Sequence, residues 1–486
     1  MVRYDLICIG CGPAGEKAAT QAAYFKRRVA VIENEPRPGG AMVNTGTIPS
    51  KTLRETALLL SAFRRRSVPG ISLKVDRNVS ILSLMARMLA VQQVEHDRIE
   101  SSIDRHAIDV ISGHGGIIDP HTVRITRSDG STRDLQTEHI LIATGSRPTD
   151  LKSLGYDHPR IVDSDGLLQL DSLPNSLTVV GGGVIGCEYA CVFGELGVQV
   201  TLIEPRDVVL GFLDDEIRAA LLRSMEAAGI AIETGRAVQR IVAPLGDEDV
   251  RVVLADGTEI NSSHVLYTAG RCGNTEGIGL EHIGVAPNER GYLTVDDTYQ
   301  TSCPGVYAAG DVIGFPALAS TSMEQGRVAA CRMFGLDFKK VVSTLYPIGL
   351  YTIPPVASVG LTEKEARGAD HEVMVGRAAM ALTARGRILE SDNLPNVGFI
   401  KIVFEYPSRR LLGVQIIGDE ATELIHIGQM VLGSAESDRT IDRFVHAVFN
   451  YPTLSETYRL AAINGLQHIA MREGRSDQIA ARAKVA

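Results

Sequence analysis

The sequence predicts an α/β protein in which one strand–turn–helix unit occurs twice before a C-terminal region of mixed α and β structure. Each unit has a short apolar run that leads into a glycine cluster, GCGPAG at Gly10–Gly15 and GGGVIG at Gly181–Gly186. A helical stretch follows each cluster, and a second apolar run then ends in an acid, Glu33 in one copy and Glu204 in the other. Repetition of the whole pattern argues against a chance match.

The first unit has the layout of a Rossmann-like dinucleotide-binding domain. Tyr4–Gly10 is predicted to be a buried strand, Glu16–Phe25 a helix and Val29–Ile32 a second strand. Glu33 follows Gly15 by 18 residues, close to the distance of about 20 residues between the glycine loop and the ribose-binding acid. The first glycine permits a tight turn, the second lets a pyrophosphate approach the backbone, and the third lets the helix pack on the strand.

The second unit repeats these features. Leu177–Val180 is predicted to be its first strand, and Val198–Ile203 its second. The downstream segments repeat as well, because HILIATGSRP at His139–Pro148 parallels HVLYTAGRCG at His264–Gly273. Two copies of one unit imply two dinucleotide sites.

Length and charge limit the possible classes of protein. A chain of 486 residues is too long for one core, so three or four domains are expected. The net charge of −9 makes nucleic acid an unsuitable partner, because nucleic-acid affinity depends on cationic surface. The one dense basic cluster, Arg64–Arg66, is interpreted as a solvated helix face. No apolar run is long enough for a membrane span, and the apolar start is too short for a signal peptide.

The cysteines indicate a reducing compartment, and we expect a cytoplasmic protein. The seven cysteines show no framework spacing, and no His/Cys pattern has metal-ligand spacing. Cys8 and Cys11 read as C-x-x-C, but an extended strand would hold them too far apart for a disulfide. Cys187 and Cys191 are expected to be small buried residues on a helix.

The segment GGAMVNTGTIPSK at Gly39–Lys51 resembles the redox-active segment of the flavoprotein disulfide reductases, the dihydrolipoamide dehydrogenase and glutathione reductase family. In that family two cysteines with four residues between them lie in this segment and face the flavin. Here Met42 and Thr47 stand at the cysteine positions, while the rest of the frame is intact. A thioether and a hydroxyl cannot form a disulfide or act as a thiolate.

The C-terminal region is similar to the dimer-interface domain of the same family. Its pattern predicts strands at Asn396–Phe404 and Leu411–Ile417, a helix at Ala421–Leu432, and a last helix that ends near Arg472, before a polar tail at Glu473–Ala486.

The family's acid-base histidine is also replaced. The family reads His-Pro-Thr-x-x-Glu, whereas this chain keeps Pro452, Thr453 and Glu456 but has Tyr451 at the histidine position. A tyrosine with a pKa near 10 is a poor general base at neutral pH. His446 is five positions early and is interpreted as a structural residue. The absence of both thiols and of their proton partner makes the chain resemble the soluble pyridine nucleotide transhydrogenase branch over essentially its whole length.

This resemblance implies a domain organisation and two kinds of nucleotide. Residues 1–150 and 275–345 would bind FAD, residues 151–274 would bind NAD(P), and residues 346–472 would form a homodimer or larger homo-oligomer. NAD(H) and NADP(H) would be substrates, with no membrane or nucleic-acid partner.

The resemblance also assigns site residues. The strand VYAAGD would place Asp311 at the ribityl chain of the flavin, and residues 317–320 would lie beside its ring. Lys51 would lie near the flavin N5 with Glu188 as its partner, and Thr47 would occupy the space of a missing sulfur, so these three are the catalytic candidates. Glu204 suits an NAD ribose, and Arg206 either offsets its charge or is a surface residue. The candidates for FAD are Gly10, Gly12, Gly15, Glu33, Gly40, Met42, Lys51, Gly115, Thr144, Gly145, Asp311 and Ala319, and those for NAD(P) are Gly181, Gly183, Gly186, Glu204, Arg206 and Gly270.

Three functions remain open at this stage. The first is reversible hydride transfer between NADPH and NAD⁺ through the flavin. The second is a diaphorase that passes electrons from NAD(P)H to a quinone, a dye or oxygen, which a flavin without thiols can also do. The third is a non-catalytic sensor of nucleotide redox state. The retained set of Lys51, Glu188, Asp311 and both glycine loops favours an enzyme over a sensor.

Overall fold

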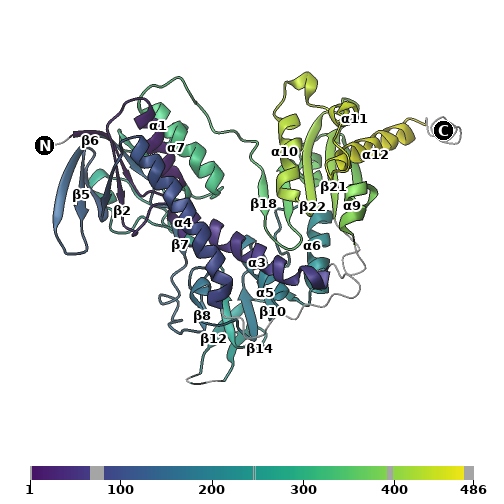
Figure 1. The fold of residues 1–486 in the computed structure, drawn as a ribbon, viewed down its shortest axis with the longest axis horizontal. Helices are drawn as coiled ribbons and strands as arrows, with labels where there is room; N and C mark the ends of the chain where they lie inside the picture. The colour runs from purple at the N-terminus through teal and green to yellow at the C-terminus, as the bar shows by residue number, and fades with distance from the viewer. Residues whose placement is uncertain (1–2, 66–80, 245, 247, 391–397, 475–486) are drawn as a thin grey trace. The chain divides into compact units, whose positions relative to one another are not determined.

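The computed structural model describes residues 3–65, 81–244, 246, 248–390 and 398–474. The chain divides into two compact units (Figure 1). Unit 1 comprises residues 1–56, 79–173 and 266–343, and unit 2 comprises residues 57–78, 174–265 and 344–486. The side chains of the predicted basic cluster Arg64–Arg66 and most of the predicted polar tail lie outside the described residues. No helix in the described ranges is both long and apolar enough to span a bilayer.

Unit 1 is built on a mainly parallel sheet with the strand order β3–β2–β1–β6–β5–β4. β6 is long enough to have two neighbours on one side, since its first half pairs with antiparallel β5 and its second half with parallel β17. The strands of this unit are β1 (Arg3–Ile9), β2 (Val29–Glu33), β3 (Asp109–Ser112), β4 (His114–Asp119), β5 (Thr122–Thr126), β6 (Thr132–Ile142), β7 (Ser146–Pro148), β8 (Ile161–Val162), β16 (Arg271–Gly273) and β17 (Val306–Ala308).

Both faces of the β1 strand are buried, as the apolar run predicts. Leu6 and Cys8 pack on the helical side, whereas Ile7 and Ile9 pack on the side of β4 and β5. The helical layer is close-packed: a Cβ atom on Gly326 of α7 would lie 2.2 Å from the Ala14 carbonyl oxygen of α1. The helices are α1 (Pro13–Tyr24), α2 (Gly40–Asn44), α3 (Thr47–Arg65, which begins in this unit), α4 (Ile81–Arg105) and α7 (Ala319–Met333), with short 3₁₀ turns at Gly166–Gln169, Leu280–Ile283 and Asp311–Ile313.

The first half of unit 2 repeats the parallel arrangement. The strand β10 lies between β9 and β11, and all three run parallel. A three-stranded antiparallel sheet of β12, β13 and β14 follows. The elements are β9 (Ser176–Val180), α5 (Val184–Glu195), β10 (Gln199–Glu204), α6 (Asp215–Ala227), β11 (Ala231–Thr234), β12 (Val238–Val242), β13 (Val250–Leu254), β14 (Glu259–Ser262) and β15 (His264–Tyr267, which begins in this unit).

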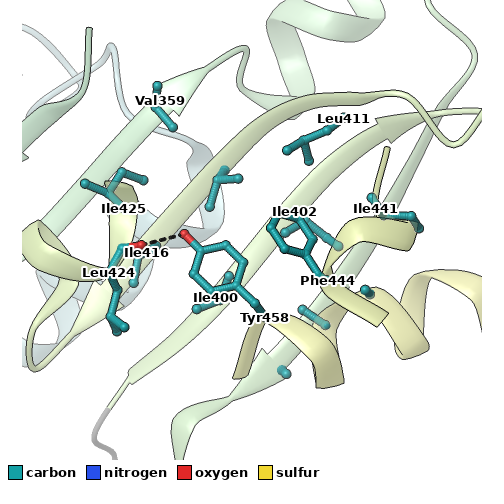
Figure 2. Packing of buried hydrophobic residues seen from close by; sticks show 14 of the residues in the cluster. Val359, Ile400, Ile402, Leu411, Ile416, Leu424, Ile425, Ile441, Phe444 and Tyr458 are labelled. Carbon is teal, nitrogen blue, oxygen red and sulfur yellow. Dashed lines mark hydrogen bonds between the residues drawn. The ribbon is translucent and has the colours of Figure 1, made fainter. Parts of the chain in front are cut away.

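The second half of unit 2 is an antiparallel sheet in the order β18–β19–β22–β21–β20, covered by helices α10 and α12. Figure 2 shows Tyr458 of α12 in the same cluster as Leu424 of α10 and the strand residues Ile400 and Ile416; its hydroxyl donates to the Leu424 carbonyl oxygen at 2.8 Å. The elements are β18 (Ile348–Leu350), β19 (Val356–Gly360), α8 (Glu363–Gly368), β20 (Val373–Ala379), α9 (Ala384–Leu389), β21 (Gly398–Glu405), β22 (Leu411–Gly418), α10 (Ala421–Leu432), α11 (Asp442–His446) and α12 (Glu456–Arg472), with 3₁₀ turns at Met380–Leu382 and Glu436–Asp438.

The predicted fold class is therefore confirmed: two Rossmann-like α/β halves and a C-terminal α+β region. The α10 bounds coincide with the predicted helix, and α12 ends at Arg472 as expected. The first helix begins at Pro13, earlier than predicted, because proline is tolerated at the first helical position. Residues 396–397 of the predicted C-terminal strand lie outside the described ranges, and β21 begins at Gly398.

One carboxylate of unit 2 predicts a pH dependence of stability. Hydrogen bonds from Arg377, and then from Lys401, lower the pKa of Glu216 to about 2. Because this pKa is depressed in the folded state, its stabilisation is present above the unfolded pKa of about 4.3 and is lost as the pH falls towards about 2. As the pH falls over this range, we expect the free energy of unfolding of Glu216→Gln to decrease by about 1 kcal/mol less than that of the unchanged protein, after allowance for solvent screening.

Urea unfolding followed by far-UV circular dichroism at about pH 5 and about pH 3 would measure this difference. Glu226→Gln, on the exposed face of the same helix, is the matched control and should keep the unchanged slope. Equal pH slopes for Glu216→Gln and the unchanged protein would contradict the expectation.

Candidate dinucleotide sites

The first glycine loop connects β1 to α1 in unit 1. Gly10 has a φ of +100°, and a Cβ atom there would lie 2.5 Å from the Ala143 carbonyl oxygen. A Cβ atom on Gly15 would lie 2.0 Å from the Gly10 carbonyl oxygen. Local packing therefore requires glycine at both positions, independently of what the loop binds.

Gly12 differs from these two glycines. Its φ of −74° suits any residue, and the atom nearest to an added Cβ would be the Gly40 Cα at 3.7 Å, an ordinary contact. Gly12 is the N-cap of α1, and no side chain in the described residues caps this helix start. The first-turn amides therefore lack helical partners, and their partial positive charge suits an anion such as a pyrophosphate. The backbone at Gly12 is thus a cradle that a side chain would fill.

Glu33 lies at the end of β2 and is buried. Its Oε2 accepts a hydrogen bond from the Cys11 amide at 2.7 Å, and its Oε1 accepts one from the Glu35 amide at 2.9 Å. Burial raises the pKa of the carboxyl group, although the backbone hydrogen bonds partly offset this effect. A pocket of about 560 Å³ begins at the next residue, Asn34, and is lined further by residues 110–114, 126–128 and 133. The acid and this pocket offer room for the ribose and the base of a dinucleotide.

Asp311 follows β17 and is held by two serines. Its Oδ2 accepts from the Ser146 hydroxyl and its Oδ1 from the Ser322 hydroxyl, each at 3.2 Å. The Nε of Arg271 in turn donates to the Ser146 hydroxyl at 3.0 Å. Sequence reasoning missed the two serines and the arginine, since only the tertiary fold brings them to Asp311. Ala319, another candidate, is the first residue of α7.

Thr144 and Gly145, at the end of β6, are tied to Asn274. The Thr144 hydroxyl donates to the Asn274 carbonyl oxygen at 2.6 Å, and the Asn274 side-chain amide donates to the Thr144 carbonyl oxygen at 2.9 Å. The Asn274 amide also donates to the Gly145 carbonyl oxygen at 3.0 Å. Gly115 of β4 lies against β1, where a Cβ atom would come to 3.0 Å from the Ile9 Cγ2.

The segment that resembles the redox-active frame forms α2 and the start of α3. Met42 packs half-buried against the core of unit 1, and Thr47 is an exposed first residue of α3. Lys51 donates to the Ser50 hydroxyl at 3.3 Å. Cys8 and Cys11, the rejected C-x-x-C pair, are free thiols in the buried core.

The expected partner of Lys51 belongs to unit 2. Glu188 is a buried residue of α5, and its Oε1 accepts a hydrogen bond from the Tyr351 amide at 2.8 Å. A Lys51–Glu188 ion pair would join residues of the two units, so it stays a prediction.

The second glycine loop joins β9 to α5 with the same local geometry. The Gly181 amide donates to the Ile203 carbonyl oxygen at 2.8 Å, the counterpart of the Gly10 bond to Ile32. Gly183 is the N-cap of α5, again without a side-chain cap, and an added Cβ atom would meet no atom within 4 Å. Gly186 lies in the buried first turn of α5. Gly270 belongs to unit 1, so its relation to this loop stays a prediction.

Glu204 ends β10, and its carboxylate is saturated with donors. Its Oε2 accepts from the Gly182 amide at 2.7 Å, and its Oε1 accepts from the Arg206 amide at 3.1 Å and from the Arg206 Nε at 2.7 Å. The Nη2 of Arg206 also reaches Oε2 at 3.3 Å. Burial acts to raise the pKa of Glu204, but the hydrogen bonds from Arg206 and Gly182 outweigh it and lower the pKa. The Arg206 side chain remains 70% exposed, so its guanidinium presents unused donors to solvent.

The segment with the missing histidine lies at the start of α12. Tyr451 is 70% exposed, and the Thr453 hydroxyl contacts the Ser455 hydroxyl at 3.3 Å. Glu456 is the first residue of α12, and His446 is exposed at the end of α11.

The cradle at Gly12 leads to a specific prediction. Gly12→Ala should fold normally, because its backbone and its surroundings accept a methyl group, but it should lose most of its bound flavin. The measurement is the flavin-to-protein absorbance ratio of the purified protein. Gly368→Ala, whose Cβ atom would meet nothing within 4 Å, is the matched control and should retain full flavin. A fully loaded Gly12→Ala protein would show that this loop is not the cradle.

Comparisons with known proteins give a consistent result. The family model described as pyridine nucleotide-disulphide oxidoreductase matches residues 4–326, and the model of the corresponding dimerisation domain matches residues 346–462. A soluble pyridine nucleotide transhydrogenase of Mycobacterium bovis (strain BCG / Pasteur 1173P2) is 42% identical over 467 residues, covering 96% of this chain and 97% of the relative. The transhydrogenase of Colwellia psychrerythraea is 38% identical over 466 residues, covering 96% and 98%.

Solved structures agree with these matches. The crystal structure of LpdA from Mycobacterium tuberculosis superposes with a TM-score of 0.86 at 30% identity, covering 95% of this chain and 99% of that one. The HOCl-induced flavoprotein disulfide reductase RclA from Escherichia coli gives a TM-score of 0.83 at 25% identity, with the same coverage.

Proposed function

Because this chain belongs to the pyridine nucleotide-disulphide oxidoreductase family, we propose that it catalyses reversible hydride transfer between NADPH and NAD⁺ with FAD as its cofactor. One observation carries this proposal: both glycine loops and their acids are in place, while Met42 and Thr47 occupy the positions where a redox disulfide would lie. The relatives at 38–42% identity that bear the transhydrogenase name support it.

The residues of unit 1 fit the cofactor. When bound, FAD supplies the two-electron chemistry that links one nicotinamide nucleotide to the other. Gly12 and the start of α1 would bind its pyrophosphate, Glu33 its ribose, and Asp311, held by Ser146 and Ser322, its ribityl hydroxyls. The remaining FAD candidates belong to the same unit: Gly10, Gly15, Gly40, Met42, Gly115, Thr144, Gly145 and Ala319.

Lys51 would hold a positive charge beside the reacting ring. A cation there stabilises negative charge that develops during hydride transfer, and Glu188 would fix its position. Thr47 would offer a hydroxyl where the family has sulfur. The protein would thus contribute stacking geometry and electrostatics rather than a redox group of its own.

Stopped-flow mixing tests the proposed reaction. The purified holoprotein is mixed with NADPH and then with NAD⁺, while flavin absorbance is followed. We expect complete bleaching by NADPH and rapid recovery on addition of NAD⁺. Recovery with a quinone but not with NAD⁺ would replace the proposal by the diaphorase alternative, and absence of bleaching would leave a nucleotide-sensing role.

The Glu204–Arg206 pair would allow one site to accept both nucleotides. A bare carboxylate repels a 2′-phosphate, but here Arg206 neutralises it and leaves donors exposed for the phosphate. Gly181, Gly183 and Gly186 would bind the pyrophosphate that both nucleotides share, with Gly270 near the nicotinamide half.

Replacement of this arginine should separate the two nucleotides. In Arg206→Gln we expect the KM for NADPH to rise by about tenfold or more, because charge-assisted hydrogen bonds to the phosphate are lost. The KM for NADH should change little. Steady-state kinetics with each reductant would measure both values, with Arg251→Gln on β13 as a control of equal charge. Equal changes in the two KM values would refute a phosphate-binding role.

The protein is expected to act as a homodimer through residues 346–462, the part matched by the dimerisation-domain model. Large apolar side chains in this part are exposed in the single chain, and burial against a second copy would remove them from water: Met430, Val448 and Tyr451. Seven free cysteines suit a reducing compartment, and we infer the cytoplasm as its location.

A further inference from the structure

A buried lysine lies at the centre of an ion cluster in unit 2. Lys401 of β21 is 2% exposed, and its Nζ contacts both oxygens of Asp214, at 3.0 and 2.9 Å. The same nitrogen contacts Glu216 Oε1 and Glu363 Oε2, each at 2.8 Å. Lysine is almost never fully buried unless it is paired, so its burial depends on these carboxylates.

The cluster keeps its charges at neutral pH. Burial disfavours the ammonium ion, but hydrogen bonds to Glu216, Glu363 and Asp214 outweigh this effect and raise the pKa of Lys401. Arg377 of β20 supplies a second cation through its ion pair with Glu216. Within the cluster, Arg377 forms ion pairs with Glu216 and Glu363. Among the described residues it forms no ion pair with Asp214.

Asp214 connects this cluster to a second element. It is the N-cap of α6, where its Oδ1 accepts a hydrogen bond from the Glu216 amide at 3.1 Å. The carboxylate therefore fixes the helix start while it is held by a lysine from the C-terminal sheet. Residues 211–215 also line a pocket of about 350 Å³. The Asp214 carboxylate itself is buried and is held by the Glu216 amide and by Lys401.

The segment before Asp214 leads directly to the second glycine loop. It begins at Glu204, whose carboxylate accepts from the Gly182 amide at 2.7 Å. Further along, the Leu210 amide donates to the Gly182 carbonyl oxygen at 3.3 Å. Val209 and Leu213 are buried, and a Cβ atom on Gly182 would lie 3.2 Å from the Val209 Cγ2. Segment 204–214 therefore contacts the Gly182 amide through Glu204 and the Gly182 carbonyl oxygen through Leu210, and its last residue, Asp214, is held by Lys401.

We propose that Lys401 is a positioning residue for the nicotinamide nucleotide: by anchoring Asp214 it holds segment 204–214, and through it the Gly182 backbone, in the geometry that binds the pyrophosphate. The inference rests on the proposed nucleotide role of this loop. A purely structural role would predict a loss of stability, but a buried ion pair is weak evidence for that, because replacement of such pairs by neutral groups often costs no stability. The positioning role instead predicts a change in nucleotide binding.

The proposal gives a distinctive kinetic signature. The pyrophosphate is common to NAD(H) and NADP(H), so loss of the anchor should raise the KM for both nucleotides by the same factor. The expected rise is about tenfold, the range over which coupled residues change binding. The kcat and the flavin content should be retained, since the ion-pair partners of Lys401 are Asp214, Glu216 and Glu363, none of which is a catalytic or FAD-binding candidate. This differs from Arg206→Gln, which should discriminate between the two nucleotides.

The test uses the full-length holoprotein and the double variant Lys401→Met/Asp214→Asn. This pair removes both charges together, and asparagine retains the capping oxygen, so no unpaired buried charge threatens folding. Lys401→Met alone is measured beside it. The control is Arg377→Met, which removes a cation from the same cluster without touching Asp214. Steady-state KM and kcat are measured for NADH and NADPH, and NADP⁺ binding is titrated calorimetrically.

Equal rises in KM for both nucleotides in the double variant, with an unchanged Arg377→Met control, would support the proposal. A folded, flavin-replete double variant whose KM values and NADP⁺ affinity lie within about twofold of the unchanged protein would overturn it. An equal rise in Arg377→Met would also overturn it, because the effect would then follow from general weakening of the cluster. Failure of the proposed function would appear separately, as absence of hydride transfer in the unchanged protein.

Discussion

The same hydrogen bond closes both glycine loops, and much of the structure depends on it. In each copy the acid at the end of the second strand accepts from the amide of the loop's second residue, Glu33 from Cys11 and Glu204 from Gly182, at 2.7 Å in both cases. The bond ties the first turn to the neighbouring parallel strand and fixes the start of the following helix. The backbone amides offset part of the cost of burying each carboxylate.

The two copies then diverge electrostatically. In the described part of the chain Glu33 forms no ion pair with an arginine, and burial raises its pKa. Hydrogen bonds from Arg206 instead outweigh the burial of Glu204 and lower the pKa of that carboxyl group. One site is therefore an acid suited to ribose hydroxyls, and the other is a neutral ion pair with donors facing outward. Under the proposed function, this divergence would let one duplicated unit serve two different ligands.

The sequence predicted those parts of the fold that depend on local pattern. Apolar runs, glycine spacing and the terminal acids located β1, β2, β9 and β10 because each signal lies within a few neighbouring residues. The same reasoning could not find Ser146 and Asn274 around the first site, since their contacts with Asp311 and Thr144 join segments more than a hundred residues apart. It also missed Ser322, whose contact with Asp311 depends on the conformation of the chain between them. It also missed Lys401, which reads as an ordinary charged residue in a β-strand until the fold places Asp214 beside it.

The surroundings of the two loops differ in a way that suits a retained cofactor and an exchanging substrate. Gly12 has the Gly40 backbone beside it, and the adjoining Ala14 packs on Gly326 of α7, so the first loop is enclosed by elements of its own unit. Gly183 has no atom within 4 Å of an added Cβ, and its loop is held from one side, through Gly182 and segment 204–214. An enclosed loop immobilises its ligand, whereas an open loop lets a nucleotide enter and leave without rearrangement. If two nucleotides use this site in turn, as proposed, such exchange is required, and the second loop would be held through segment 204–214, whose last residue, Asp214, pairs with Lys401.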